Sequence, residues 1–324
     1  TEYYMNKIIK NIMNHASLVN KPPVLFDIGA SGFIHRKWRS IAKYSVCIAF
    51  DADTRDFDAS ITENKNWRKL IKLNRLVTET PSNGVNFYLT QSPHCSSTLL
   101  PDETALEPWA FNQLFKVVDT LKLPATDIKT ALKETDLEYI DWFKTDSQGT
   151  DLRIFCSIPE KIVNNILTAE FEPGIIDAMK GEDKLHSLMS YMDTKPFWVS
   201  NMKILGSNRI NKIDLSSLNY FQKLSLGSFL KTAPGWCEIT YINTLKSDNL
   251  SIRQYLLTWL FSTLNGEHGF GLFIARKGFE IFKDPIFLSL KKKSYRKLSH
   301  GYLKFMKHVF RRLIISRFQW LNNH

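Results

Sequence analysis

VLFDIGASGFIHRKWRSIAKYSVCIAFDAD, residues 24–53, contains in succession an apolar run, a glycine-bearing turn, a predicted helix, a second apolar run and two acidic residues. The runs at 24–28 and 45–50 fit strands of a parallel sheet that is covered on both faces. Residues 33–43 are predicted to form the connecting helix. This order predicts an α/β domain with a nucleotide-type ligand site at the carboxyl ends of the strands.

The turn after the first strand supplies the candidate backbone contacts to a ligand. Its glycines permit a tight turn and close approach of the ligand, and the helix start offers unpaired N–H groups to a carboxylate. Asp51 ends the second strand about 20 residues later, at the spacing typical of an acid that binds ribose hydroxyls, with Asp53 as a second candidate. The turn residues are Gly29, Ala30, Ser31 and Gly32.

The cofactor is not fixed by this segment alone. Asp27-x-Gly29-x-x-Gly32 departs from the G-x-G-x-x-G pattern that seats a pyrophosphate. S-adenosylmethionine has no phosphate and carries an ammonium group, which Asp27 could meet directly or through water. A methyl donor, a nicotinamide cofactor and an α/β crossover without a ligand all stay open on these residues.

A second motif lies at residues 139–151, YIDWFKTDSQGTD, where an apolar strand leads into Asp146, a glycine turn and a predicted helix at 152–158. It resembles the DFLKIDVEGAE signature of the FkbM family of S-adenosylmethionine-dependent methyltransferases, with Gln148 where the family usually has Glu. The segments CSSTL (95–99), TDI (126–128) and AEFEP (169–173) are similar to further family features. The resemblance covers about residues 21–243.

This resemblance implies a Rossmann-like class I methyltransferase fold, with a seven-stranded, mostly parallel sheet, helices on both faces and S-adenosyl-L-methionine as cofactor. Acids at predicted strand ends support it, namely Asp27, Asp51, Glu79, Asp146 and Glu172. No metal site is expected. The candidate cofactor-binding residues are Asp27, Gly29, Ala30, Ser31, Gly32, Asp51, Asp53, Thr78, Glu79, Ser97 and Asp146.

Three residues are candidates for catalysis. Asp146 is the preferred base because it ends the fourth strand near the expected methyl group, although it could equally cap the helix that follows. His94 is a second candidate base in a loop that could also be inert. Glu172 could orient the acceptor or simply cap a neighbour. Ser97, with its neighbour Ser96, could instead bind the cofactor carboxylate.

A missing motif narrows the chemical class of the group that accepts the methyl. The Asn/Asp-Pro-Pro-aromatic run typical of amine methyltransferases is absent after the fourth strand, where the chain has TDSQG (145–149), so amine methylation of nucleic acid is disfavoured. The resemblance implies O-methylation, of a sugar hydroxyl in a glycan or polysaccharide precursor or of a small molecule. The alternatives are a non-catalytic scaffold that binds a membrane or partner, and an RNA ribose methyltransferase. Tryptophans that could stack on a sugar or only pack are Trp109, Trp142, Trp198 and Trp236.

Positive charge gathers at the C-terminus. Residues 285–324 hold ten Lys or Arg and no acid, so of the net charge of +11 about +1 belongs to the rest of the chain. Apolar residues between 303 and 321 recur at helical spacing. This helix could pack on the body, lie on anionic lipid or bind nucleic acid, and the last is the least favoured partner.

Four scattered cysteines without C-x-x-C spacing favour a reducing, cytoplasmic setting, peripheral to the inner face of the membrane if the tail binds lipid. No apolar run is long enough to span a bilayer. We expect three segments: an N-terminal helix (1–20), the methyltransferase domain (21–245) and a helical, basic extension (246–324). Oligomeric state is left open.

Further elements are expected along the domain. Residues 60–73 are predicted as a helix, 75–79 as the third strand with its end near the adenine, and 85–89 as its neighbour. Residues 103–123 are expected to form a helix or a lid. A strand at 166–172, a helix at 183–192 and strands at 197–205 and 236–243 complete the domain, with an insertion at 206–232.

Overall fold

The computed structural model describes residues 2–30, 34–55, 57, 66–246, 250–299 and 305–306. The chain separates into two compact units, Val19–Ser247 and a second unit made of Thr1–Leu18 with Asp248–His324. The N-terminal helix therefore shares a unit with the C-terminal extension. Ser31 and Gly32 of the predicted cofactor turn, and Phe33 at the start of the predicted helix, lie outside the described residues.

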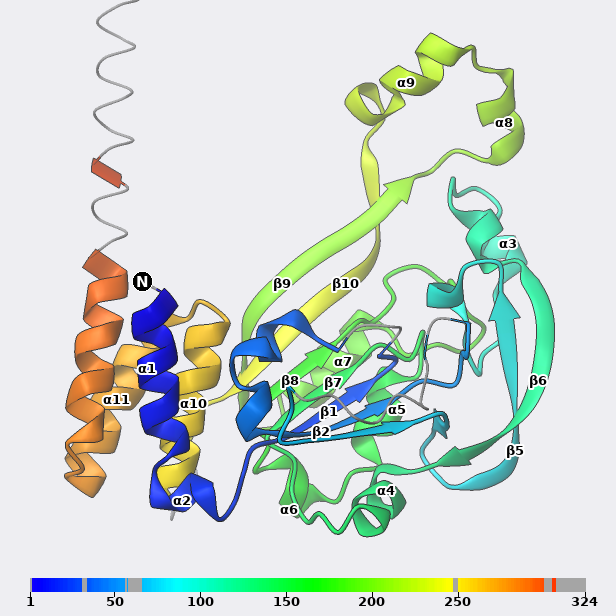
Figure 1. The fold of residues 1–324 in the computed structure, drawn as a ribbon. Helices are drawn as coiled ribbons and strands as arrows, with labels where there is room; N and C mark the ends of the chain where they lie inside the picture. The colour runs from blue at the N-terminus through cyan, green and yellow to red at the C-terminus, as the bar shows by residue number, and fades with distance from the viewer. Residues whose placement is uncertain are drawn as a thin grey trace, which may run out of the picture. The chain divides into compact units, whose positions relative to one another are not determined.

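The larger unit is built on a seven-stranded sheet in the order β3-β2-β1-β7-β8-β10-β9 (Figure 1). Its first five strands pair in parallel, whereas β10 is antiparallel to both of its neighbours. The predicted α/β class with a seven-stranded, mostly parallel sheet is confirmed. The strands are Val24–Ile28 (β1), Val46–Phe50 (β2), Lys69–Leu73 (β3), Trp142–Thr145 (β7), Thr168–Phe171 (β8), Phe197–Asn208 (β9) and Thr232–Asn243 (β10).

A second, three-stranded sheet has the order β4-β6-β5, formed by Leu76–Val77 (β4), Ser82–Thr90 (β5) and Val117–Thr126 (β6). The prediction of 75–79 as the third strand of the main sheet was wrong, because β4 pairs with β6 instead. The third strand is β3, so the helix predicted at 60–73 was wrong over 69–73. These residues pair with β2 in parallel along their whole length, and this tertiary pairing overrides the helical pattern of a Lys-rich segment.

The connection between β1 and β2 also differs from prediction. Instead of an α-helix over 33–43 it contains two 3₁₀ helices, η1 (Arg36–Ser40) and η2 (Ala42–Tyr44). The Ala42 carbonyl accepts the amides of Ser45 and Arg68, which ties the turn to the strand that follows. Trp38 is fully buried and packs edge-on against Trp142 of β7, with ring centroids 5.8 Å apart.

Residues 103–123 do not form one helix, and the alternative expectation of a lid stays a prediction. They contain α3 (Glu103–Leu106), the 3₁₀ helix η4 (Asn112–Phe115) and then the start of β6. The other helices of the larger unit are α4 (Ile128–Glu134), α5 (Asp151–Cys156), α6 (Glu160–Val163), α7 (Leu185–Met192), α8 (Lys212–Ser217) and α9 (Tyr220–Phe229). Of these, α5 and α7 lie close to their predicted positions.

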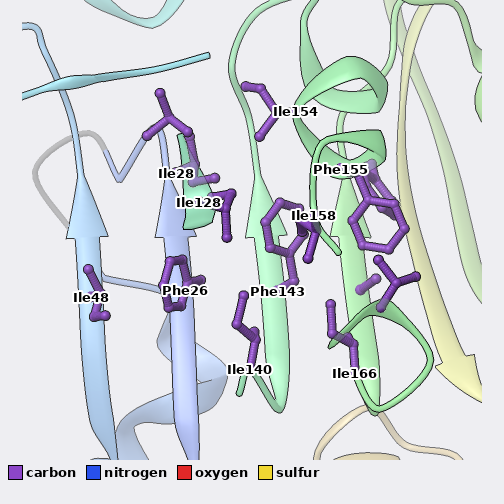
Figure 2. Close-up of a cluster of buried hydrophobic side chains, with 14 of the residues drawn as sticks. Phe26, Ile28, Ile48, Ile128, Ile140, Phe143, Ile154, Phe155, Ile158 and Ile166 are labelled. Carbon is purple, nitrogen blue, oxygen red and sulfur yellow. The ribbon is translucent and has the colours of Figure 1, made fainter. Parts of the chain in front are cut away.

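The main core covers one face of the sheet (Figure 2). Phe26 and Phe143 stand side by side in the register of β1 and β7, and Ile154 and Phe155 of α5 pack onto them. Each fully buried side chain of this size contributes about 2 kcal/mol. The face with Asp27 and Lys144 lies opposite, since residues alternate along each strand.

The smaller unit is helical. It contains α1 (Glu2–Met13), α2 (Ala16–Val19, at the boundary), α10 (Ile252–Leu264), α11 (His268–Phe282) and helical residues 286–299. Four apolar residues of α1 are buried, namely Ile8, Ile9, Ile12 and Met13. Ten of the residues of α10 are buried, which makes it the central helix of this unit.

The basic tail is described in part. The periodic residues between 303 and 321 lie outside the described residues except for Met306. The three interpretations of that helix therefore stay predictions. No helix among the described residues is long and apolar enough to cross a bilayer.

Candidate cofactor and acceptor site

A pocket opens at the carboxyl ends of β1, β2 and β7, where ligands bind in sheets of this kind. Gly29, Asp51 and Asp146 line it, as do Leu76 and Val77 from β4. Its remaining lining residues are Ile28, Phe50, Ala52, Asp53, Arg75, Phe87, Pro93, His94, Ser96, Thr98, Ser147, Gln148 and Thr150. We call it the first pocket.

Gly29 marks the point where the ends of β1 and β7 meet. Its φ is +73°, and a Cβ at this position would lie 2.1 Å from the Asp146 carbonyl oxygen. The Gly29 amide donates to Phe50 O at 2.9 Å, and the Asp146 amide donates to Ile28 O at 3.0 Å. The glycine is therefore needed for the close approach of the two strand ends at the pocket floor.

The two acids after β2 have different environments. Asp51 lines the pocket, and its Oδ1 accepts the Asp53 amide at 2.8 Å. Asp53 is buried, accepts hydrogen bonds from the Arg55 guanidinium and from Ser96 Oγ, and has little capacity left for a ligand. Burial alone would raise the pKa of Asp53, but the hydrogen bonds from Arg55 outweigh it and lower that pKa.

The serine pair joins the two halves of the site. Asp53 lies in the loop after β2, and Ser96 Oγ is 3.1 Å from its Oδ2. Ser97 Oγ donates to Gln148 O at 2.7 Å, in the loop after β7. Ser97 is buried and is absent from the lining of the first pocket, so the structure gives it a bracing position rather than one facing a cofactor carboxylate.

Asp27 does not face the pocket. It is 1% exposed, and its Oδ1 accepts a hydrogen bond from Lys144 Nζ at 2.9 Å. The two residues are direct neighbours in the register of β1 and β7. From the sequence, Asp27 was expected to bind the ammonium group of the cofactor. In the structure, Asp27 instead binds the ammonium group of Lys144.

The pair extends into a row of charges across the sheet. Glu170 on β8 is next to Lys144 in register, and its carboxylate is 3.1 Å from Lys37 Nζ and 3.4 Å from His35 Nε2. Burial alone would lower the pKa of Lys144, but Asp27 and the other acids raise it. Burial also lowers the pKa of His35, so that ring is neutral at pH 7. This row was not predicted from the sequence, where its one local signal is Lys144, two residues before Asp146 in the second motif.

Asp146 and Glu172 form a coupled acid pair at the ends of β7 and β8. Burial raises the pKa of Asp146, while Lys144 and a 2.6 Å hydrogen bond from Gln148 Nε2 oppose the rise. Burial, with the charges of Asp146 and Asp151, raises the pKa of Glu172 to about 9. Glu172 is therefore protonated at neutral pH and can donate a hydrogen bond to Asp146.

Asp151 holds these two strand ends together. Its Oδ1 accepts the Ser147 amide at 2.8 Å and Thr145 Oγ1 at 3.0 Å, and its Oδ2 accepts the Glu172 amide at 2.9 Å. Burial is the main reason that its pKa rises to about 6. This acid, part of the family-like motif, is an anchor rather than a pocket residue.

A second pocket adjoins the first and shares His94, Asp146 and Gln148 with it. Its walls combine acids with aromatic rings. The further lining residues are Ser92, Cys95, Phe111, Leu114, Phe115, Gly149, Glu172, Gly174, Ile176, Ala178, Met179, Glu182, Gly206, Ser207, Gly235 and Trp236. All three predicted catalytic residues, Asp146, His94 and Glu172, thus lie around one junction.

The other predicted residues lie elsewhere. Ala30, Thr78 and Glu79 line neither pocket, and Thr78 Oγ1 donates to Thr80 O at 2.8 Å. Glu79 follows β4 of the smaller sheet, so it is not an acid at the end of a main-sheet strand. Of the four tryptophans considered for stacking, Trp236 lines the second pocket, whereas Trp142 is fully buried.

Comparison with protein-family models and with curated proteins gave no match for this chain. Only the geometry of the site therefore bears on function. The first pocket, with Asp51 at a strand end, meets the second pocket at the Asp146 carboxylate, and the second pocket is lined by acids and aromatic rings. Such an arrangement can hold two ligands with their reactive groups on either side of Asp146.

Proposed function

We propose that this chain is an S-adenosylmethionine-dependent O-methyltransferase of the FkbM type. The observation that carries the proposal is the meeting of two pockets at Asp146, one beside Gly29 and Asp51, the other open to an acceptor. The sheet order supports it, since five parallel strands followed by an inserted antiparallel strand before the edge are typical of class I methyltransferases. Fold alone does not define an activity, so the pockets carry more weight.

The lining of the first pocket favours this cofactor over a dinucleotide. Its acids Asp51 and Asp146 suit a ligand with a sulfonium and an ammonium group, whereas a pyrophosphate would face them unfavourably. Asp51 would bind the ribose hydroxyls, and Leu76 and Val77 would flank the adenine. S-adenosylmethionine, when bound, supplies an electrophilic methyl group. The chain's part is to align an acceptor with it and to exclude water.

The second pocket favours a neutral, hydroxylated acceptor. The residues that line it include the carboxyl groups of Asp146, Glu172 and Glu182 but no lysine or arginine, so no such side chain in the pocket offers a positive charge to the phosphate groups of a nucleic acid. Phe111, 6.2 Å from Trp236 between ring centroids, offers an apolar face for a sugar ring. A glycan or a polysaccharide precursor fits these walls.

Asp146 would accept the proton of the acceptor hydroxyl. Glu172 in its protonated form and Gln148 both hydrogen-bond Asp146, which orients the carboxylate and opposes the rise in its pKa that burial causes. His94, exposed at the junction of the pockets, is the alternative base.

Calorimetry with S-adenosylhomocysteine tests the proposal. The intact chain is expected to bind, and Asp51→Ala to weaken binding at least about tenfold through loss of charged hydrogen bonds to ribose. Asp119→Ala, an exposed acid of β6, is the matched control and should bind like the unmodified chain. Absence of binding by the intact chain would favour a non-catalytic scaffold.

A further inference from the structure

The ribbon formed by β9 and β10 carries an exposed apolar surface that the proposed function does not use. Residues 206–208 and 232–234 pair with each other at the far end of this ribbon, and α8 and α9 are attached beyond them (Figure 1). We call residues 209–231 the arm tip. Its two helices belong to the larger unit and lie at the end of the ribbon rather than over the main core.

Both tip helices are stabilised by local hydrogen bonds. Asn211 caps α8 by accepting the Asp214 amide at 2.8 Å. Asn219 and Gln222 form a reciprocal capping box at the start of α9, with hydrogen bonds of 2.8 and 2.9 Å. Such caps favour these helices without requiring burial of their side chains.

The apolar side chains of the tip are nevertheless large and exposed. Tyr220, Phe221 and Leu224 fall within an arc of about 100° on α9, by the rotation of an α-helix. Phe221 is 78% exposed, and Phe229 at the end of α9 is 82% exposed. Ile213 on α8 is 78% exposed. A group of exposed apolar residues on one segment marks a surface that binds a partner molecule or a membrane.

The charges of the tip identify the kind of contact. Four exposed basic residues lie there with a single acid, Asp214, and no salt bridge joins a carboxylate to these four within the described part of the chain. A second copy of the chain would bring the same positive charges against them in a two-fold contact, which is unfavourable. The basic residues are Arg209, Lys212, Lys223 and Lys231.

We infer that the arm tip binds the surface of an anionic lipid bilayer. Phenylalanine, leucine and isoleucine side chains insert below the headgroups, while lysine stems extend to anionic phosphates. Ile213 and Leu224 have no ring to stack on a base, so nucleic acid explains the patch less well. This inference is independent of the proposed methyl transfer, and it concerns a different segment from the basic tail.

Vesicle flotation of the full-length chain tests it. Vesicles of phosphatidylcholine with about a third phosphatidylglycerol should bind the protein, and pure phosphatidylcholine should bind it far less. The triple variant Phe221→Ser, Leu224→Ser, Phe229→Ser should lose at least about tenfold in binding. A charge variant, Lys212→Gln with Lys223→Gln and Lys231→Gln, should lose about fivefold per lysine and become less sensitive to salt.

The control variant changes Val19→Ser and Val118→Ser, which are 48% and 53% exposed outside the tip, and should bind vesicles normally. Hydrogen exchange should show vesicle-dependent protection of 212–230. The inference is overturned if the unmodified chain does not bind anionic vesicles, or if the triple variant binds them equally. It is also overturned if the triple variant instead abolishes a dimer seen by light scattering, or an RNA complex, with vesicle binding unchanged.

Discussion

Lys144 Nζ lies 2.9 Å from Asp27 Oδ1, and this contact joins the two motifs that identified the site in the sequence. The motifs are 117 residues apart, measured between these two residues, and their strands β1 and β7 are neighbours in the sheet. Asp27 thereby stabilises the fold next to the first pocket instead of forming part of its lining. The adjoining acids Asp51 and Asp146 keep the positions at which ligands are proposed to bind.

Removing the Lys144 ammonium should destabilise the protein strongly. Lys144→Met leaves Asp27 buried without its cation, which costs about 3 kcal/mol in the free energy of unfolding. Urea unfolding measures it. Lys203→Met is the matched control, because its partner Glu238 is solvent-exposed at 48%, and it should cost below about 1 kcal/mol. Equal losses of unfolding free energy in the two variants would show that the buried ion pair stabilises the protein no more than the exposed one.

Gly29→Ala tests the close approach of β1 and β7. The added Cβ would lie 2.1 Å from a backbone oxygen, so the two loops must separate, and we expect a loss of stability of at least about 3 kcal/mol together with loss of S-adenosylhomocysteine binding. Gly181→Ala shares the positive φ, +71°, but has open space around its Cβ, and should cost only about 1 kcal/mol. The comparison separates the steric clash from backbone strain.

Much of the sheet could be predicted because its signals are local. Apolar runs such as 24–28 and 46–50 indicate buried strands whatever their partners, and Gly29 marks a turn by itself. The pairing of Asp27 with Lys144 depends on register between distant strands, which no local pattern specifies. The assignment of Leu76–Val77 to a second sheet is likewise decided by its pairing with β6.

The sequence predicted which acids lie at the site, but only some of their roles. Asp51, Asp146, His94 and Glu172 do line the pockets. By contrast, the hydrogen bond from Ser97 to the Gln148 carbonyl oxygen is a tertiary contact between segments 51 residues apart. The pairing of Asp53 with Arg55 is local, but no pattern in the sequence singled it out. The sequence predicted an insertion at 206–232 but not its exposed apolar surface, which depends on how α8 and α9 are placed.

Glu172→Gln should change the pH dependence of stability. Because the pKa of Glu172 in the folded state is about 9, above its ordinary value near 4.5, its stabilising contribution is complete below about pH 4.5 and is lost as pH rises through 9. Glutamine stays neutral, so the variant should gain on the order of 5 kcal/mol over the unmodified chain between pH 5 and pH 9.5, because each pKa unit corresponds to about 1.4 kcal/mol. Guanidinium unfolding at both pH values measures this gain.

The exposed Glu138→Gln is the control for that experiment and should leave the pH profile unchanged. A profile for Glu172→Gln that runs parallel to that of the unmodified chain would contradict the assignment of a protonated Glu172 at neutral pH.

Thiol accessibility should distinguish Cys156 from the other cysteines. Cys47, Cys95 and Cys237 are buried, and burial raises the pKa of each thiol, which further lowers its reactivity. A disulfide reagent at pH 8 should therefore modify one of the four cysteines in the native protein and all four after unfolding. Cys156→Ser should abolish the native reaction, and rapid native labelling of that variant would contradict the described core.

The position of S-adenosylhomocysteine in a crystal of the complex tests the central claim most directly. The account predicts that both ribose hydroxyls lie within hydrogen-bonding distance of the Asp51 carboxylate, and that the sulfur lies at the junction of the two pockets, facing Asp146. A molecule bound away from Asp51, or with its sulfur turned from the second pocket, would contradict it.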